Sequence, residues 1–247
     1  MSEDQSCIIH HFSHYCSLTK EEKALLVSLE ENPTDIKAGS LLWEVGDPAK
    51  EFCTLHSGWA YSYRHLESGD RQILEIYLPG DIIGLREFAF SQRLENVCMI
   101  TDGVVCHFPH KRLLEIFRQS VPLTSVVFAI ASRHQALVTE RLVTLARRSA
   151  RQKTAHFLYE MYLRLRQTNG DIDRQFRLPL SQEQLADILG LSPVHVSRTF
   201  SLLSEEGLVF RDRHNVTIPD LKALAAAGEF DDCYLHDDVR PLFDLSA

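Results

Sequence analysis

The stretch LSQEQLADILGLSPVHVSRTFSLLSEEGLV, residues 180–209, predicts two short helices joined by a tight turn. Ser181 and Gln184 form a capping-box pattern, in which the Ser hydroxyl accepts from the third helical N–H while the Gln side chain reaches back to the Ser backbone. Gly190 suits the end of this first helix, because glycine adopts a positive φ at little cost. The first helix is therefore expected to begin after Ser181 and to end at Gly190.

The second helix has an equally clear start. Ser192 is a good N-cap residue, and Pro193 suits the first helical position, where its missing N–H costs nothing. The helix is expected to reach Glu206 and to stop at Gly207. Two helices separated by a short glycine-containing turn are the plan of a helix-turn-helix.

The faces of the two helices indicate what the motif binds. Apolar residues that recur at helical spacing are expected to form a shared core, and they are Leu185, Ile188, Leu189, Val196, Phe200 and Leu203. The opposite face of the second helix carries small or polar groups near its N-terminal half, the end that meets base edges in the major groove of DNA. The candidate DNA-binding residues on this face are Ser192, Val194, His195, Ser197 and Arg198. From these faces alone, a helical hairpin with a solvated polar face is the alternative.

A β-wing is expected directly after the second helix. Residues 207–220, GLVFRDRHNVTIPD, predict a strand, a turn and a second strand. Arg211, Arg213 and His214 suit contacts to phosphates, and Arg213 completes the candidate DNA-binding set. Arg198 on the second helix suits a bidentate contact to a guanine, worth roughly 1 to 3 kcal/mol of discrimination. The wing therefore favours a DNA-reading module over a plain helical hairpin.

Length, composition and charge favour two modest domains. The chain has 247 residues, of which 45% are hydrophobic. Its net charge of −8 is uneven, because residues 147–219 carry 11 Lys and Arg against 8 Asp and Glu, whereas residues 220–247 carry 2 against 7. A mildly basic module between acidic segments suits a polyanionic partner. No apolar run approaches the roughly 20 residues of a membrane span, and the acidic start lacks a secretion signal, so a cytoplasmic protein without a membrane partner is expected.

Residues 33–109 consist of short apolar or alternating runs that are broken by turn residues. The turn signals recur every 7 to 12 residues, at Gly39, Gly46-Asp47, Ser57-Gly58, Ser68-Gly69-Asp70 and Pro79-Gly80-Asp81. This spacing predicts an antiparallel β-roll or jelly roll, and by itself it also allows a generic β-sandwich. A cupin-type metal enzyme would need closely spaced ligands inside such a roll. His56, His65 and His107 are scattered, so no enzyme activity is expected.

A long helix is expected between the roll and the helix-turn-helix, because no Gly or Pro interrupts residues 123–148. A helix of about 25 residues is roughly 37 Å long, more than one small domain covers. Its apolar residues recur near a heptad spacing and predict a coiled-coil seam between two copies of the chain. The candidate dimerisation residues are Val127, Ile130, Leu137, Val138, Leu142 and Leu145. The alternative is that this stripe packs on the chain's own β-roll.

The order of these parts resembles the CRP/FNR family of bacterial transcription regulators. The most specific pieces are SGWAYSYRHLESGDRQILEIYLPGDIIG, residues 57–84, and the helix-turn-helix stretch, and the resemblance covers about residues 15–220. It implies an α+β protein with an N-terminal jelly-roll β-domain, a long dimerisation helix and a C-terminal winged helix-turn-helix. It also implies a homodimer that binds a palindromic operator in double-stranded DNA and recruits RNA polymerase.

The resemblance also suggests domain boundaries. They are 1–30 for an N-terminal Cys/His-containing segment and helix, 31–120 for a cyclic-nucleotide-binding-like β-roll sensor, 121–148 for the dimerisation helix, 149–220 for the winged helix-turn-helix and 221–247 for an acidic C-terminal tail. The sequence departs from the cyclic-AMP-binding branch, which places Glu, Arg and Ser around the nucleotide where this chain has Leu85, Glu95 and Asn96. A carboxylate in place of a phosphate-binding guanidinium is repulsive, so cyclic AMP is not the expected ligand. In the reading helix, Val194 replaces the family's usual Glu, which suits a thymine methyl and predicts a different half-site.

Residues 7–16, CIIHHFSHYC, place two cysteines and three histidines within ten residues. The FNR branch, as the resemblance implies, holds a [4Fe-4S] cluster on three N-terminal cysteines and one cysteine in the roll. Cys7, His10, Cys16 and Cys106 take those positions here, so a cluster with three Cys and one His is expected to sense oxygen, redox state or nitric oxide. The alternatives are zinc, haem, or a metal-free regulator with a mobile tail that senses another small ligand in the roll.

Overall fold

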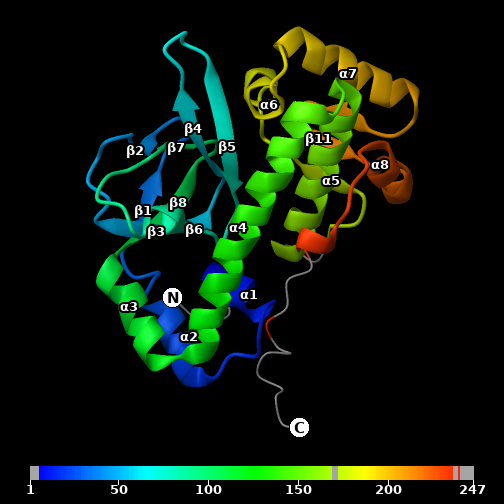
Figure 1. Ribbon diagram of the computed structural model, residues 1–247. Helices are drawn as coiled ribbons and strands as arrows, with labels where there is room; N and C mark the ends of the chain where they lie inside the picture. Colours follow the sequence, from blue (N-terminus) through cyan, green and yellow to red (C-terminus); the bar gives the residue numbers. More distant parts are fainter. Residues whose placement is uncertain (1–5, 169–171, 236–238, 240–247) are drawn as a thin grey trace. The chain divides into compact units, whose positions relative to one another are not determined.

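The computed structural model describes residues 6–168, 172–235 and 239 of the chain. These residues form two compact units. The first unit contains residues 6–64, 75–134 and 239, and the second contains residues 65–74 and 135–235. Figure 1 labels their helices and strands in chain order.

The first unit is a β-roll, as the turn spacing predicts. In the described part of the chain it is built on two antiparallel four-stranded sheets, with the strand orders β1-β8-β3-β6 and β2-β7-β4-β5. The bounds are β1 Pro33–Ile36, β2 Leu41–Trp43, β3 Glu51–Ser57, β4 Ala60–His65, β5 Arg71–Tyr77, β6 Ile82–Ile83, β7 Asn96–Met99 and β8 Gly103–Pro109. A short 3-10 helix, η2, covers Leu85–Glu87. The β-rich N-terminal domain of the predicted fold class is confirmed.

A compact apolar core lies inside the roll. Side chains from strands of both sheets form it, and its buried members are Trp43, Cys53, Leu55, Ala60, Tyr77, Ile83, Val97, Met99 and Val105. Alternation along the strands places these residues on one face, because successive side chains of a strand point to opposite sides of the sheet. The core therefore follows directly from the short apolar runs between the turns.

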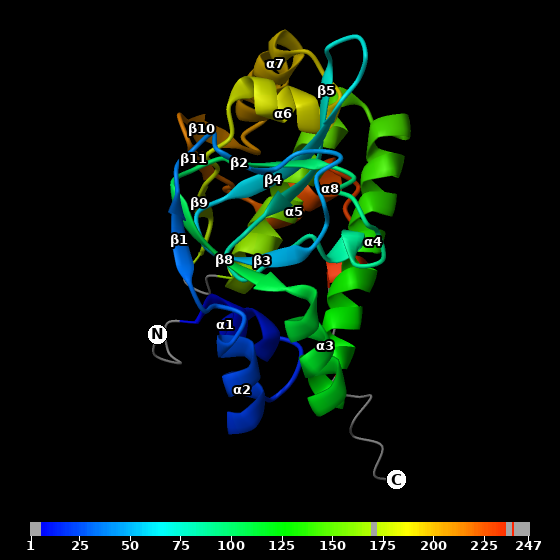
Figure 2. The ribbon, with the colours of Figure 1, turned by 90° about the vertical axis from the view of Figure 1, so that its left-hand side faces the viewer.

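Four helices build a second core on the first unit. They are α1 Cys7–Ser13, α2 Lys20–Val27, α3 His110–Gln119 and α4 Val121–Arg147. The first three gather at one end of the roll (Figure 2). Ile8 and Phe12 of α1, Leu26 of α2 and Ile130 of α4 are buried in one apolar cluster. The N-terminal segment is thus part of the folded core from Ser6 onward.

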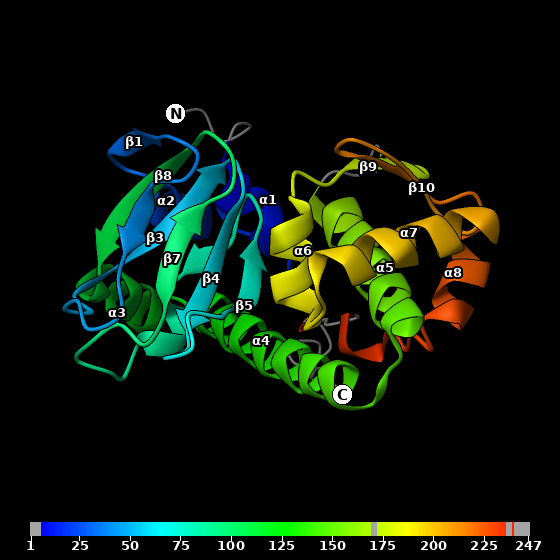
Figure 3. The same cartoon turned by 90° about the horizontal axis from the view of Figure 1, so that it is seen from above.

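The second unit is a winged helix-turn-helix, again as predicted. A three-stranded antiparallel sheet with the order β10-β11-β9 lies beside the helices of the described chain (Figure 3). The bounds are α5 Ala150–Thr168, β9 Gln175–Arg177, α6 Gln182–Leu189, α7 Pro193–Glu205, β10 Phe210–Asp212, β11 Asn215–Thr217, α8 Leu221–Ala227 and the 3-10 helix η3 Cys233–Leu235. In this sheet Val216 of β11 pairs with Phe176 of β9. The helix α5 contacts α6, α7 and α8.

Candidate DNA-reading and sensor sites

The two helices of the reading motif begin and end where the sequence predicts. Ser181 Oγ accepts from the N–H of Gln184 at 3.0 Å, and Gln184 Oε1 accepts from the N–H of Ser181 at 2.9 Å. Gly190 closes α6 at φ 60°, a conformation that an L-residue with a side chain rarely adopts. Ser192 Oγ accepts from the N–H of His195 at 3.3 Å and so caps α7.

The helix α7 has one buried face and one exposed face. Val196, Thr199 and Leu203 point into the unit and are buried. The opposite face carries the candidate DNA-binding residues, and all of them are exposed: Ser192, Val194, His195, Ser197 and Arg198. These groups cluster at the N-terminal half of the helix, the half that reaches base edges in helix-turn-helix proteins. Their roles in DNA binding stay predictions.

The wing divides the basic residues into two kinds. Arg213 is exposed at the turn between β10 and β11, where it has a positive φ of 51°. Arg211, in contrast, donates through Nη2 to the Leu180 carbonyl at 2.7 Å, and its guanidinium lies 5.0 Å from the centre of the Phe200 ring. Arg211 therefore joins the wing to α6 and α7, whereas no residue that the structure describes makes a comparable contact with the Arg213 guanidinium. The sequence placed both on phosphates, because it does not reveal that Arg211 faces the module.

The helix α4 has two apolar faces instead of one. Of the candidate dimerisation residues, Val127, Ile130 and Leu137 are buried within the chain, with exposed fractions of 6%, 3% and 3%. Val138 and Leu142 are exposed. A further set of large apolar side chains lies outward at intervals of seven or fourteen residues, namely Val121, Phe128 and Leu142, with exposed fractions of 69%, 74% and 68%. We call Val121, Phe128, Val138 and Leu142 the outward stripe.

By length and composition, α4 is the one helix of the described chain that is suited to crossing a membrane, with a mean hydropathy of 1.2 over its most apolar window. Its two separate faces account for this value. One face packs on the first unit through Val126, Val127 and Ile130. The outward stripe supplies the rest, and an amphipathic helix of a soluble core passes the same test.

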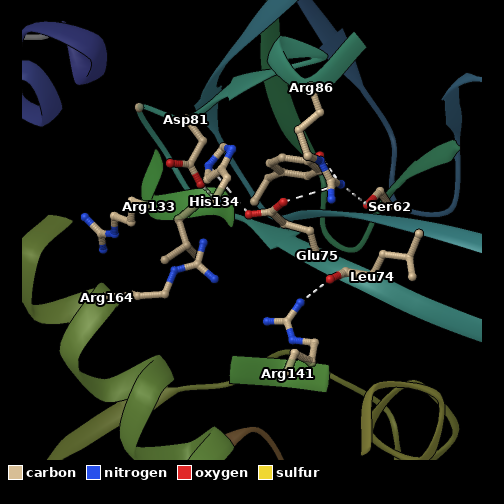
Figure 4. Close-up of polar contacts among 12 residues, drawn as sticks. Ser62, Leu74, Glu75, Asp81, Arg86, Arg133, His134, Arg141 and Arg164 are labelled. Atoms are coloured by element: carbon tan, nitrogen blue, oxygen red, sulfur yellow. Dashed lines mark hydrogen bonds and ion pairs between the residues drawn. The ribbon is translucent and has the colours of Figure 1, made fainter. Parts of the chain in front are cut away.

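A polar cluster lies inside the roll around Arg86 and Glu95, next to Leu85. The Arg86 guanidinium donates through Nη2 to Glu95 Oε2 at 2.6 Å. It also donates to Ser62 Oγ at 3.2 Å (Figure 4). The same nitrogen lies 3.4 Å from Glu75 Oε2. His134 of α4 adds an imidazole whose Nε2 lies 3.6 Å from the other Glu75 oxygen. Arg86 is thus held between two carboxylates.

This cluster does not fit a cyclic nucleotide. The polar lining of the pocket is Tyr77, Arg86, Glu87, Glu95 and His134, and the other lining residues are glycine or apolar. Burial raises the pKa of the Glu95 carboxyl, against the lowering effect of Arg86 beside it. A phosphate at Arg86 would have to displace Glu95 and would then face two carboxylates, Glu75 and Glu95, at short range. Position 95 has a Glu instead of the Arg of the cyclic-AMP-binding branch. A guanidinium is nevertheless present in the pocket, at Arg86 of η2, but it is already paired with Glu95.

Among the described residues, the four candidate cluster ligands are not gathered in one site, although Cys7 lies near Cys106. Cys7 is half-buried at the start of α1, and Cys16 is buried beyond its end beside Glu22. His10 is exposed, with its ring 5.0 Å from that of His14. Cys106 is fully buried in β8. Within the described residues, no three His, Cys, Asp or Glu side chains are arranged to hold a metal ion.

The chemistry around the thiols also disfavours a cluster. Burial raises the pKa of Cys106 to about 11, and the nearby Glu30 carboxylate adds to the shift. Burial and Glu30 likewise raise the pKa of Cys7. Iron-sulfur ligation needs thiolates, and a nearby buried carboxylate favours the neutral thiol in the absence of a metal. In this arrangement burial and Glu30 favour the neutral form of both thiols, and the described residues show no assembled metal site.

Residues 7–16 serve a different purpose in the fold. Glu30, only 3% exposed, accepts from Ser6 Oγ at 2.6 Å and from the N–H of Ile8 at 3.3 Å, and so caps α1. His11 is buried with Nδ1 2.9 Å from the Gly80 carbonyl, and burial lowers the pKa of its ring, which favours a neutral imidazole that donates to that oxygen. Gly80 is required there, because a Cβ would lie 2.8 Å from His11 Cβ.

The other end of the segment is fixed to α4. Arg133 Nη1 donates to the Tyr15 hydroxyl at 3.1 Å, and the Tyr15 side chain is 1% exposed. Together with the His11 contact, this hydrogen bond ties α1 to the turn before β6 and to the long helix. The stretch is a structural helix that holds the roll to α4, and the sequence signal that would have revealed it is the apolar spacing of Ile8, Ile9 and Phe12.

Both units match known protein families. Residues 152–227 match the family described as Crp-like helix-turn-helix domain, and residues 33–120 match the family described as cyclic nucleotide-binding domain. The two matches follow each other in the chain on either side of the long helix. The chain belongs to the CRP/FNR family of transcription regulators.

Alignments with curated relatives cover most of this chain. The transcriptional activator protein anr of Pseudomonas aeruginosa is 27% identical over 210 residues, which are 85% of this chain and 86% of that protein. The fumarate and nitrate reduction regulatory protein of Escherichia coli is 25% identical over 221 residues, 90% of this chain and 88% of that protein. The relatives are regulators and not enzymes, and this chain is a DNA-binding transcription regulator of the same type.

Solved structures agree on the fold. The structure of FixK2 from Bradyrhizobium japonicum superposes with a TM-score of 0.71 at 24% identity, covering 79% of this chain and 96% of that one. The c-di-GMP responsive global regulator CLP of Xanthomonas campestris superposes with a TM-score of 0.62 at 16% identity, covering 80% and 98%. These two structures support the fold described above and assign no ligand to this chain.

Proposed function

We propose that this regulator is a homodimer that pairs along the outward stripe of α4 and reads a two-fold symmetric operator with two copies of α7. The observation that carries the proposal is the exposure of Val121, Phe128 and Leu142 on one face of α4 while Ile130 is buried in the chain's own core. Large apolar side chains at heptad spacing favour a second helix as their cover. Contact with RNA polymerase and a cytoplasmic location stay predictions.

A symmetric operator follows from the dimer. Arg211 of the wing is bound internally and adds little to phosphate contacts, so we expect a single copy of α7 and one wing to supply little affinity for DNA. Two modules joined by α4 engage two half-sites. Because the second module then binds intramolecularly, the affinity for the full operator is expected to be much higher than for one half-site. Footprinting and gel shifts on duplexes from the region upstream of its own gene test this proposal. Equal affinity for a single half-site and for the full palindrome would contradict it.

We further propose that regulation uses neither an iron-sulfur cluster nor a cyclic nucleotide. The support is the pairing of Arg86 with Glu95, and the position of Glu30 beside two candidate thiols. A metal-free regulator that responds to another small ligand agrees with the Arg86–Glu95 pair and with the position of Glu30 near Cys7 and Cys106. Two measurements check it independently.

The first measurement is metal content. Protein purified without oxygen is expected to contain neither stoichiometric iron nor acid-labile sulfide, and to show no charge-transfer absorption, because the thiols near Glu30 remain protonated and His10 faces away. A Cys106→Ser variant is expected to bind operator DNA as tightly as the wild type. A full complement of iron and sulfide that Cys106→Ser removes would overturn the proposal.

The second measurement is the thermal shift with cyclic AMP. Binding at a hundred times the Kd would stabilise the fold by about 2.7 kcal/mol. No shift is expected at millimolar cyclic AMP, since Glu75 and Glu95 both face the place of the phosphate. An Arg86→Ala variant serves as the control for any nonspecific shift. A rise in Tm that Arg86→Ala abolishes would show that the nucleotide enters the pocket.

A further inference from the structure

The chain continues past the region that matches the Crp-like helix-turn-helix family, which ends at residue 227. We call residues 228–235 the C-terminal brace. The sequence suggested an acidic tail here, yet Leu235 is 2% exposed and its carbonyl accepts from Gln167 Nε2 at 3.1 Å. The segment is therefore folded onto α5, inside the second unit.

The backbone of the brace approaches α5 closely at Gly228. A Cβ on this residue would lie 2.7 Å from the His156 nitrogen and 2.8 Å from its Cα, distances that real Cβ atoms essentially never show. Two residues later the Phe230 ring lies 4.6 Å from the His156 ring and 4.9 Å from the Tyr159 ring, measured between centroids. The close backbone approach and the ring contacts together hold the C-terminal brace in a defined position on α5.

The same segment binds the junction between α4 and α5. Arg148, just after α4, donates through Nη2 to the Glu229 carbonyl at 3.3 Å. Gln152, in the first turn of α5, donates through Nε2 to Glu229 Oε1 at 2.7 Å, while its own Oε1 accepts from the N–H of Ser149 at 2.9 Å. The junction residues on both sides thus share Glu229 as a partner.

Side-chain contacts also link the two helices directly, and one of them, between Arg141 and Glu160, is an ion pair. Glu140 of α4 lies 3.3 Å from His156 Nε2 of α5, and Arg141 of α4 lies 3.3 Å from Glu160 of α5. The Tyr234 ring of the brace lies 5.7 Å from the Phe230 ring, measured between centroids, and burial, followed by the nearby Glu160, raises the pKa of the Tyr234 hydroxyl. Covering the pairs keeps water out and strengthens their attraction.

We propose that the C-terminal brace fixes the angle between the last turns of α4 and the helix α5, and so sets the half-site spacing that the dimer accepts. This inference rests on the proposed dimer. Because α4 carries the dimer seam and α5 carries the reading motif, the angle at residues 148–149 determines where each α7 is presented. A junction held by side-chain contacts is ordered before binding and discriminates between spacings, whereas a loose junction adapts to several.

The test uses the full chain with Gly228→Val, which forces the brace away from His156. Probes are the footprinted operator, the same duplex with one base pair added or removed at its centre, and a single half-site. The wild type is expected to prefer the native spacing by at least about tenfold. Gly228→Val is expected to reduce this preference to about twofold or less, with half-site affinity unchanged within about twofold.

Two companion variants separate the possible causes. Ala226→Val places the same valine side chain at an exposed position of α8 and is expected to retain the wild-type preference. Phe230→Ala removes the ring between His156 and Tyr159 without placing an atom against the backbone, and it decides the question if Gly228→Val does not fold. A folded Gly228→Val or Phe230→Ala variant that weakens all probes equally, or that keeps the preference, overturns the proposal. A wild type that binds the half-site as tightly as the palindrome refutes the dimer instead.

Discussion

Phe128→Asp is expected to convert the protein into a folded monomer. The Phe128 side chain is 74% exposed in the single chain and lies in the outward stripe, so the substitution removes nothing from the core of the first unit. In the dimer it would bury a carboxylate from each protomer on the seam. An unpaired charge in an apolar interface costs several kcal/mol, and an increase of the dimer Kd by at least about a hundredfold follows. Analytical ultracentrifugation measures the change, and circular dichroism checks that the helices remain.

The matched variant is Ile130→Ala on the other face of α4. Ile130 is 3% exposed and belongs to the apolar cluster of the first unit. Its truncation is expected to lower the free energy of unfolding by about 2 to 5 kcal/mol while the protein stays dimeric. If Phe128→Asp remained a dimer and Ile130→Ala became a monomer, the seam would lie on the opposite face from the one we propose.

Arg198→Ala is expected to remove the preference for the operator over a scrambled duplex. The Arg198 side chain is exposed on the N-terminal half of α7, and its fork suits the O6 and N7 atoms of a guanine. Loss of a bidentate contact costs roughly 1 to 3 kcal/mol at each half-site, so two half-sites together account for a loss of about a hundredfold. Fluorescence anisotropy at one fixed salt concentration, with both duplexes, gives the ratio directly.

Two arginine variants serve as controls for this result. Arg118→Ala removes the same charge from an exposed position of α3 and is expected to change neither affinity. Arg213→Ala at the wing is expected to weaken both duplexes equally and to reduce the salt dependence, as the loss of a phosphate contact does. An Arg198→Ala protein that still selects the operator would show that sequence is read by other residues. The dimer is expected to be intact in every case.

The reading motif was predictable because its signals are local. Ser181 and Gln184 are three residues apart and cap the start of α6. Gly190 adopts the positive φ that ends the helix because it has no side chain, so local sequence contains most of what determines α6. The same holds for Ser192 and Pro193 at the start of α7. The β-roll was predictable at the level of its turns, for the same reason.

The faces of α4 were less accessible from the sequence. Val127 and Phe128 are neighbours with similar hydropathy, yet one is buried in the chain and the other is exposed. Periodicity identifies an amphipathic helix but not which of two apolar stripes meets the roll. The seam that the sequence suggested combines residues of both stripes, and only the packing of α1, α2 and α3 against α4 separates them.

The sensor residues show the same limit more sharply. The spacing of Cys7, His10 and Cys16 resembles a cluster motif, but whether they converge depends on residues far away, such as Glu30 and Gly80. Arg86 likewise acquires its partners from other strands, Glu75 on β5 and Glu95 before β7. A motif in the chain predicts available chemistry, and the distant neighbours decide whether it is used.

The sequence by itself determined the order of β-roll, long helix and winged helix-turn-helix, together with the caps and turns that bound the reading helices, because these depend on residues within a few positions of one another. Only the tertiary structure decided which face of α4 is left uncovered, which thiols lie beside a carboxylate, and that residues 228–235 lie against α5 rather than in solvent. Burial and charge pairing join residues that are tens of positions apart, and the free energy of those contacts is set by the folded arrangement as a whole.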